Sequence, residues 1–186
     1  MDGEKLKWET RDVRLLLRTP VFSVMGQHER AANGIEGDYI ALEAPDCVVV
    51  IAEADDSFVL VRQFRHGAAC LTAEFPGGVI DRGEAPETAA RRELEEETGC
   101  RAGKLTYLGC CSPNPALFRS VIHFFLAEEL ESTGVQHLDR DELIEIVRTP
   151  KAEVISSFGR GEELHAFMGT ALLFYLRHRS GGNIPL

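Results

Sequence analysis

The sequence lacks the features that mark several special classes of protein. It contains no run near the ~20 consecutive apolar residues of a membrane-spanning helix, and its first residues include no apolar segment typical of a secretory signal. There are 5 cysteines in 186 residues and no C-x-x-C spacing, so the pattern favours neither a disulfide framework nor a cysteine metal site. We therefore expect reduced thiols in a cytoplasmic protein.

Positive charge is also scarce. The chain has 20 Lys and Arg residues against 30 Asp and Glu residues, which gives a formal net charge of −10. Because a chain this acidic is a poor general ligand for nucleic acids and anionic membranes, we expect neither as a partner. A substrate that carries phosphate would require recruited cations. The composition, 44% hydrophobic and 27% charged, is close to that of ordinary soluble proteins, and 186 residues suit one domain or one domain plus an extension.

Apolar runs separated by turn residues predict a small N-terminal sheet followed by a larger domain. We expect residues 1–45 to form a β extension, residues 46–179 to form the main domain and residues 180–186 to form a flexible tail. The clearest hairpin signal is the turn at 54–57, which lies between two β-branched apolar runs. The expected strands are 13–17, 21–25, 39–42, 47–52, 58–64, 71–75, 105–111, 121–127 and 143–147.

Two helices are expected in the main domain. Pro86 is suited to the first turn of one helix and Gly99 to its end. Near the C-terminus, apolar residues at i, i+3 and i+4 spacing indicate an amphipathic helix of about four turns. These residues are Leu164, Phe167, Met168, Ala171, Leu172 and Tyr175. The order of elements predicts a mixed sheet covered by helices, an α/β fold.

Three carboxylates crowd onto one face of the first helix. Because successive residues rotate by ~100°, Glu93, Glu96 and Glu97 fall within about 100° of arc. Like charges one turn apart destabilise a helix, and a hard divalent cation such as Mg²⁺, which prefers oxygen ligands, would offset that repulsion. Such a cation would also attract a diphosphate and activate a bound water. A solvated acidic surface helix is the plain alternative.

Residues around this face can support the carboxylates. Arg92 lies four residues before Glu96 and can pair with it, while Glu84 can hold Arg92 from the preceding loop. Gly77 and Gly78 allow the backbone to approach closely, so that a backbone carbonyl there can serve as a metal ligand.

This spacing resembles the Nudix box, G-x5-E-x7-R-E-U-x-E-E-x-G-U, in which U is a bulky apolar residue. Every fixed position agrees, and the one soft departure is a cysteine at the last position. The matching residues are Gly78, Glu84, Arg92, Glu93, Leu94, Glu96, Glu97, Gly99 and Cys100. The resemblance implies a Nudix α/β/α sandwich in which Gly78, Glu84 and Gly99 are structural. It also implies Mg²⁺-dependent hydrolysis of a nucleoside diphosphate derivative, with Mn²⁺ as a possible substitute.

Within that superfamily the chain is most similar to the ADP-ribose and ADP-sugar pyrophosphatase group. The similar features are the N-terminal extension, the segment Val61-Arg-Gln-Phe-Arg65 and the segment Glu74-Phe-Pro-Gly-Gly78. The resemblance implies hydrolysis of a nucleoside diphosphosugar, ADP-ribose first, to a nucleoside monophosphate and a sugar phosphate. It also implies a homodimer in which the extension shares the substrate site. The implied metal ligands are the carbonyl of Gly77 and the carboxylates of Glu93 and Glu97, with Glu96 close by or acting through water.

The resemblance further implies an acidic residue in a late loop, acting as catalytic base or extra ligand. Glu142 is the preferred candidate, with Asp141 and Glu145 behind it. A solvated acidic turn is an equal alternative. Catalysis is thus expected to involve Glu96 and Glu142, with Arg92 holding a ligand in place.

Other residues give weaker indications of a substrate site. The guanidinium of Arg65 suits a phosphate or a ribose, or it is a surface charge at a strand end. Phe64 and Phe118 can stack on a base, although core packing is the favoured interpretation of Phe64. His165 on the last helix is interpreted as structural.

Other functions remain open at this point. The chain can be a Nudix hydrolase of another nucleoside diphosphate derivative, such as a dinucleoside polyphosphate, coenzyme A, NADH or capped RNA. It can also be a non-catalytic sensor of nucleotide sugars, although the box keeps all its glutamates. A diphosphate isomerase would require further catalytic residues, for which the sequence has no convincing pattern.

Overall fold

The structure, a computed structural model, describes residues 3–140, 142–162 and 165–182. The chain divides into two compact units. One unit combines residues 1–45 with the segment Ser112–Val121, and the other combines residues 46–111 with residues 122–186. In the described part of the chain, no helix is both long and apolar enough to cross a membrane.

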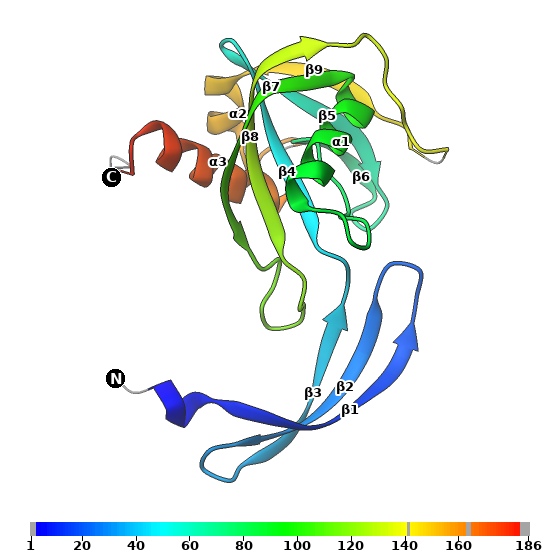
Figure 1. Ribbon diagram of the computed structural model, residues 1–186, viewed down its shortest axis with the longest axis vertical. Helices are drawn as coiled ribbons and strands as arrows, with labels where there is room; N and C mark the ends of the chain where they lie inside the picture. Colours follow the sequence, from blue (N-terminus) through cyan, green and yellow to red (C-terminus); the bar gives the residue numbers. More distant parts are fainter. Residues whose placement is uncertain (1–2, 141, 163–164, 183–186) are drawn as a thin grey trace. The chain divides into compact units, whose positions relative to one another are not determined.

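The first unit is a three-stranded antiparallel sheet preceded by a short 3₁₀ helix, η1 (Gly3–Leu6). Its strands β1 (Trp8–Arg18), β2 (Ser23–Ala31) and β3 (Glu36–Glu43) follow one another in space as they do in the sequence (Figure 1). Every residue of β1 is exposed. The predicted N-terminal sheet is therefore present, with strands longer than the apolar runs that indicated them.

The second unit contains a six-stranded mixed sheet. Strands β6, β5, β4, β8 and β7 lie in that order, and β9 pairs with β5 on a separate edge. The pair β4–β8 is parallel and the other pairs are antiparallel. The strands are β4 (Cys47–Ala54), β5 (Ser57–Arg65), β6 (Cys70–Glu74), β7 (Cys100–Cys111), β8 (Ile122–Ser132) and β9 (Glu145–Pro150).

Helices cover both faces of this sheet. Alternate residues of the central strand point to opposite faces and pack against different helices. Val48 and Val50 of β4 pack in the cluster that includes helix α1 (Pro86–Thr98). Val49 and Ile51 pack in the cluster that includes helices α2 (Lys151–Ser157) and α3 (Ala166–Arg179). Figure 1 shows α1 on one side of the sheet and α3 on the other. The expected α/β/α sandwich is confirmed.

Two expectations about the elements need correction. The strand predicted at 143–147 begins later, at Glu145, because its pairing with Arg62 of β5 sets the start of the ladder. The sequence prediction also missed α2, whose 7 residues are too few for a helical period to stand out. Leu164 of the predicted amphipathic helix lies outside the described residues, as do residues 183–186 of the predicted tail.

Candidate active site

Helix α1 and the loops at its ends position the acidic residues. The helix ends at Gly99, which adopts the left-handed conformation with φ 60° and donates its N–H to the carbonyl of Glu95 at 2.8 Å. A side chain at Gly99 would begin 2.8 Å from the carbonyl oxygen of Val135. Glycine is therefore required both by the conformation and by the close approach of this loop, as its place in the box predicted.

The loop after β8 supplies donors to the last turn of α1. The Gln136 side-chain amide donates to the carbonyl of Glu97 at 2.6 Å, and the His137 N–H donates to the carbonyl of Glu96 at 2.9 Å. Carbonyls at a helix C-terminus otherwise lack intrahelical partners. These two bonds fix the backbone from which the carboxylates project.

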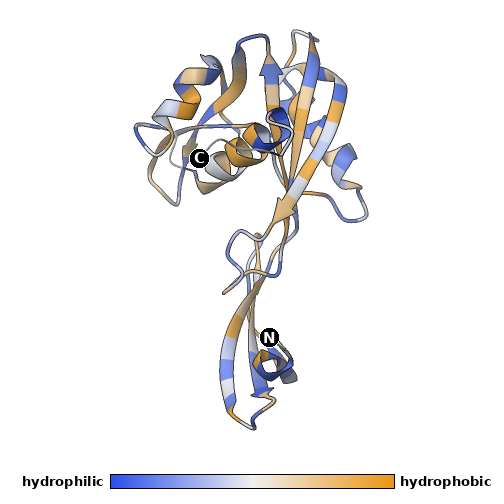
Figure 2. Ribbon diagram, turned by 90° about the vertical axis from the view of Figure 1, so that its left-hand side faces the viewer, coloured by the Kyte–Doolittle hydropathy of each residue, from blue (hydrophilic) through white to orange (hydrophobic). Residues whose placement is uncertain are grey.

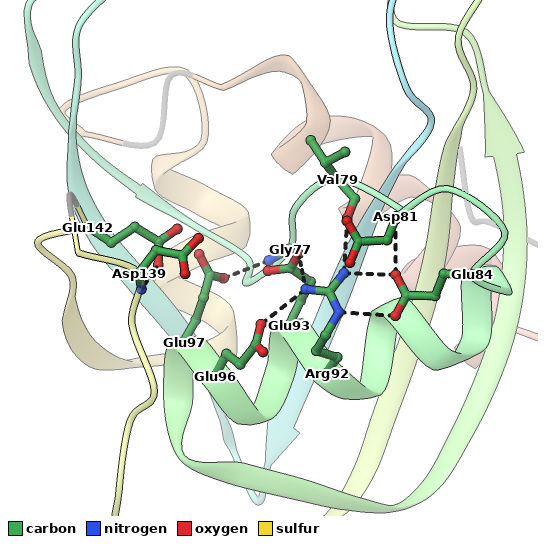
Figure 3. Close-up of polar contacts among 10 residues, drawn as sticks. All are labelled: Gly77, Val79, Asp81, Glu84, Arg92, Glu93, Glu96, Glu97, Asp139 and Glu142. Carbon is green, nitrogen blue, oxygen red and sulfur yellow. Dashed lines mark hydrogen bonds and ion pairs between the residues drawn. The ribbon is translucent and has the colours of Figure 1, made fainter. Parts of the chain in front are cut away.

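Arg92 gathers three glutamates around one guanidinium (Figure 3). Its Nε and Nη2 donate to the two carboxylate oxygens of Glu84 at 3.0 and 2.9 Å. Its Nη1 donates to Glu93 at 2.8 Å and to Glu96 at 3.0 Å, while Nη2 also donates to the carbonyl of Val79 at 3.1 Å. The predicted contacts of Arg92 with Glu84 and Glu96 are confirmed. The bonds from Arg92 lower the pKa of Glu84 below its ordinary value.

Two glycines bring the loop before α1 against the sheet and against the acidic face. The N–H of Gly77 donates to Glu97 Oε2 at 2.8 Å. A Cβ at Gly77 would lie 2.1 Å from the carbonyl oxygen of Val48, and one at Gly78 would lie 2.4 Å from Glu93 Oε1. Glycine at 77 is thus required by the close approach of backbone, whereas a side chain at 78 would displace the Glu93 carboxylate.

The direction of the Gly77 carbonyl follows from the hydrogen bonds of its neighbours. The flanking carbonyls of Pro76 and Gly78 accept hydrogen bonds from Val50 and Val48 of β4 at 2.8 and 2.9 Å. Since successive carbonyls of an extended segment alternate in direction, the carbonyl of Gly77 is turned away from β4. This orientation is compatible with the metal-ligand role predicted for it.

The surroundings of Glu97 disfavour its ionised form. Its side chain is buried, and burial together with the charges of Glu93 and Glu142 raises its pKa to about 8. The N–H of Gly77 acts in the opposite direction but does not outweigh them. Burial also raises the pKa of Glu93, against the effect of its bond from Arg92. A nearby cation would remove the cost of ionising both carboxylates.

Glu142 is brought to this acidic group from the loop between β8 and β9. Its N–H donates to the carbonyl of Asp139 at 3.1 Å, and its Oε2 accepts the N–H of Asp139 at 3.0 Å. Figure 3 shows its carboxylate beside that of Glu97. Of the reserve candidates, Glu145 pairs with Arg62 at 3.3 Å and Asp141 lies outside the described residues.

The chemistry of this donor set fits a hard divalent cation. The acidic group offers the carboxylates of Glu93, Glu97 and Glu142 and the carbonyl of Gly77, all of them oxygen donors. The raised pKa values of Glu93 and Glu97, caused first by burial and then by neighbouring carboxylates, show that the chain alone disfavours their ionised forms. Among the described residues, however, no three acidic, histidine or cysteine side chains already stand close enough to enclose an ion. Glu93 is kept out of such a group because its carboxylate is hydrogen-bonded to Arg92.

A cavity of about 1070 Å³ adjoins this group. It is bounded by the loop before α1, the turn between β5 and β6, the Glu142 loop and the start of α3. Residues that line it include Val48, Gln63, Phe64, Arg65, His66, Thr72, Glu74, Gly77, Gly78, Glu142, His165 and Phe167. Its volume is ample for a small organic ligand.

One polar cluster in the cavity wall was missed by the sequence prediction. Glu74, whose side chain is 4% exposed, accepts bonds from Arg65 at 2.9 and 2.8 Å and lies 2.6 Å from His165 Nδ1. The hydroxyl of Thr72 also donates to it at 2.6 Å. The signal in the sequence was a glutamate within an apolar strand. The structure thus gives the guanidinium of Arg65 a partner within the chain.

The two aromatic candidates for base stacking differ in their placement. Phe64 is 49% exposed and lines the cavity, so the favoured core interpretation was wrong. Its ring meets the edge of His66 with centroids 5.3 Å apart. Phe118 belongs to the other unit, where it bridges to Leu42 of β3, and it is not among the described residues that line the cavity.

Comparisons with known proteins agree with the composition of this site. The NUDIX domain family model matches residues 43–166. An ADP-ribose pyrophosphatase of Bacillus subtilis (strain 168) is 38% identical over 117 residues, which cover 62% of this chain and 63% of that protein. The chain thus spans slightly less than two thirds of that relative. An ADP compounds hydrolase, NudE, of Escherichia coli (strain K12) is 30% identical over 146 residues, or 77% of this chain and 78% of that protein.

A solved structure extends the similarity to nearly the whole chain. The crystal structure of an ADP compounds hydrolase superposes with a TM-score of 0.84 at 27% identity, covering 96% of this chain and 97% of that one. Every fixed position of the Nudix box lies in the loop before α1, on α1 or directly after it, and the family model covers most of the chain. The chain therefore belongs to the Nudix family of hydrolases.

Proposed function

We propose that the protein hydrolyses the diphosphate bond of a nucleoside diphosphosugar, with ADP-ribose as the first choice. The products would be a nucleoside monophosphate and a sugar phosphate. The observation that carries the proposal is the buried Glu97, whose ionisation is disfavoured by its surroundings. It lies with Glu93 and Glu142 beside a cavity of about 1070 Å³. The names of the Bacillus and Escherichia relatives, both of which act on ADP compounds, support this substrate class.

Nudix hydrolases generally use divalent metal ions, and we propose Mg²⁺ for this protein, with Mn²⁺ as a substitute. The carbonyl of Gly77 and the carboxylates of Glu93 and Glu97 would hold it, with Glu96 close by or acting through water. When bound, such an ion offsets the charge of the diphosphate, polarises a phosphoryl oxygen and lowers the pKa of a coordinated water.

The residues around this set have separate tasks in the proposed reaction. Glu142 would take the proton from the attacking water, and its bonds with Asp139 hold its loop in place. Arg92 would keep Glu93 and Glu96 in their rotamers through its bonds to both. Phe64, exposed in the cavity, would offer a stacking face to a base or sugar.

We infer further that the protein is a homodimer formed through the N-terminal sheet. Large apolar side chains are exposed on its strands, among them Leu16 (47%), Leu17 (55%) and Ile40 (47%). Figure 2 shows hydrophobic segments along these strands. Clustered exposed apolar residues are typical of interfaces. Light scattering should give twice the mass of one chain, and Leu17→Glu should lower it to the mass of one chain. A single-chain mass for the wild type would contradict the dimer.

A cytoplasmic location is proposed with it. The support is that no disulfide links the five cysteines, all of which lie in the described part of the chain.

The activity can be tested by phosphate release with Mg²⁺, with and without added alkaline phosphatase. The panel would contain ADP-ribose, other nucleoside diphosphosugars, diadenosine polyphosphates, coenzyme A and NADH. Phosphate that appears from ADP-ribose only when the phosphatase is present indicates that the diphosphate bridge was cut into two monoesters. No turnover of any compound with Mg²⁺ or Mn²⁺ would contradict the enzymatic proposal and favour the sensor alternative. Preferred turnover of another compound would replace ADP-ribose as the substrate.

A further inference from the structure

Four hydrogen bonds surround the buried carboxylate in the cavity wall. Arg65 donates two of them, from Nε and Nη2, and Thr72 donates one from its hydroxyl. The fourth joins Glu74 Oε2 to His165 Nδ1 at 2.6 Å. Because its oxygens already accept these bonds, Glu74 orients the neighbouring side chains and does not itself bind a ligand. Of the four side chains in this cluster, Glu74 and Thr72 are buried, while Arg65 and His165 are partly exposed and line the cavity.

The charge on Glu74 determines which nitrogen of His165 carries a proton. Burial alone would raise the pKa of Glu74, but the bonds from Arg65, His165 and Thr72 hold it well below its ordinary value. An ionised carboxylate only accepts hydrogen bonds, so Nδ1 of His165 must be the donor. A neutral imidazole protonated at Nδ1 is a hydrogen-bond acceptor at Nε2. That nitrogen lies on the ring edge turned away from Glu74.

The ring of His165 has a second contact besides Glu74. Its face lies against Phe167, with ring centroids 4.5 Å apart. Three positions earlier in the sequence, the carboxylate of Glu162 accepts two bonds from Arg62 of the sheet, each of 2.6 Å. The carbonyl of Glu162 also accepts the N–H of Ala73 at 3.1 Å. A ring held by its bond to Glu74 and its contact with Phe167 loses little conformational entropy when a ligand binds.

We propose that His165 is a specificity-determining residue, whose Nε2 accepts a hydrogen bond from a hydroxyl of the sugar attached to the substrate's diphosphate. The proposal rests on the proposed function and specifies the group beyond the diphosphate. A hydroxyl can donate to Nε2, whereas an ionised phosphate oxygen is itself an acceptor. Because Arg65 and Glu74 neutralise each other, this wall has no excess positive charge that would favour a phosphate. The site therefore selects an unphosphorylated, hydroxylated sugar.

Two substitutions at this position separate recognition from positioning. His165→Asn places an amide N–H where Nδ1 donates to Glu74 but removes the acceptor at Nε2. His165→Gln can return an acceptor oxygen near Nε2 while losing the bond to Glu74. His123→Asn is a matched control, since that histidine bonds to Tyr107 on another part of the sheet.

Two substrates report on the sugar hydroxyls. One is ADP-ribose, and the other is adenosine 5′-diphosphate esterified at its terminal phosphate with butanol, which keeps the nucleoside and the diphosphate. We expect His165→Asn to raise KM for ADP-ribose about tenfold with kcat nearly unchanged, as for the loss of one hydrogen bond. KM for the butyl ester should not change. His165→Gln should recover part of the lost affinity for ADP-ribose.

Equal losses on both substrates would overturn the proposal, because His165 would then act only by supporting Glu74. An unchanged KM for ADP-ribose in the Asn variant would overturn it as well. If the wild-type protein cleaves neither substrate, the proposed function fails. Calorimetry with the α,β-methylene analogues of both compounds then tests His165 separately. The Asn variant should weaken only the binding of the sugar analogue, and absence of binding to the wild type would overturn the proposal.

Discussion

Glu74 in the cavity wall and Glu97 on helix α1 are buried to the same degree, but their surroundings are opposite. Glu74 meets a guanidinium, an imidazole and a hydroxyl, and its pKa is held well below its ordinary value. Glu97 accepts one backbone N–H, and burial together with the charges of Glu93 and Glu142 raises its pKa to about 8. The same residue type at the same burial thus has opposite protonation behaviour.

This difference separates a residue that organises structure from one that is prepared for a ligand. The charge of Glu74 is offset within the chain, so its removal would leave its partners without an acceptor. The charge of Glu97 is not offset within the chain, and an added cation would stabilise it. Perturbed carboxylates of the second kind are typical of functional sites.

The largest effect is expected at Glu97. Glu97→Gln should lower kcat on the preferred substrate on the order of a thousandfold, because a metal ligand and a site charge are lost together. Its thermal midpoint in EDTA at pH 8 should stay the same or rise, since a buried charge has been removed. Glu95→Gln is the matched control, because Glu95 pairs with Arg101 away from the site. Unchanged turnover in Glu97→Gln would contradict the metal assignment.

Glu74→Gln should instead act on stability first. The substitution leaves Arg65 and His165 with a weaker acceptor, and we expect the free energy of unfolding to fall by about 2 to 3 kcal/mol. Urea denaturation followed by circular dichroism would measure it. Glu87→Gln removes an exposed pair with Arg91 and should cost no more than about 0.5 kcal/mol. A similar small loss for both variants would remove the contrast between Glu74 and Glu97.

The stability of the metal-free protein should pass through a maximum as pH changes, with Glu74 causing the loss on the acidic side and Glu97 the loss on the basic side. The pKa of Glu97 is higher in the folded chain than in the unfolded chain, so metal-free protein should lose stability as pH rises from about 5 to 8. The pKa of Glu74 is lower in the folded chain, so stability should be lost as pH falls below about 4.5. Thermal midpoints measured in EDTA from pH 3 to pH 9 would test this.

Two comparisons sharpen that measurement. Saturating Mg²⁺ should remove most of the loss above pH 5, because the cation stabilises the ionised carboxylates. Glu97→Gln should flatten the same region without Mg²⁺. A wild-type midpoint that stays constant from pH 5 to pH 8 in EDTA would show that the charge of Glu97 is already offset within the chain.

The smallest effect is expected from Gly78→Ala, which alters the acidic group indirectly. The new Cβ would lie 2.4 Å from Glu93 Oε1, so this flexible carboxylate must move while the backbone can stay. We expect the Mg²⁺ concentration for half-maximal activity to rise about tenfold, with little change in the thermal midpoint. Gly3→Ala, which meets no atom within 4 Å, is the control. No change in Mg²⁺ dependence would mean that Glu93 is not placed by this close approach.

Much of the fold followed from local patterns. The N-terminal strands, the central hairpin, α1 and the last helix were all predicted, because each has a period or boundary residues that one segment carries by itself. The short helix α2 was not, since its 7 residues contain too little periodicity. The environment of Phe64 was also predicted wrongly. It ends an apolar run, and only the position of the cavity made it exposed.

The sequence by itself determined the acidic face of α1, since the helical period places Glu93, Glu96 and Glu97 together wherever the helix forms. It also determined the support of Arg92 by Glu84 and the glycines that the box requires. Only the tertiary structure decided which carboxylates are offset. His165 reaches Glu74 across 91 positions, and Glu142 reaches the acidic face from a different loop. A pKa depends on burial and on neighbours in space, and neither is contained in the spacing of residues along a chain.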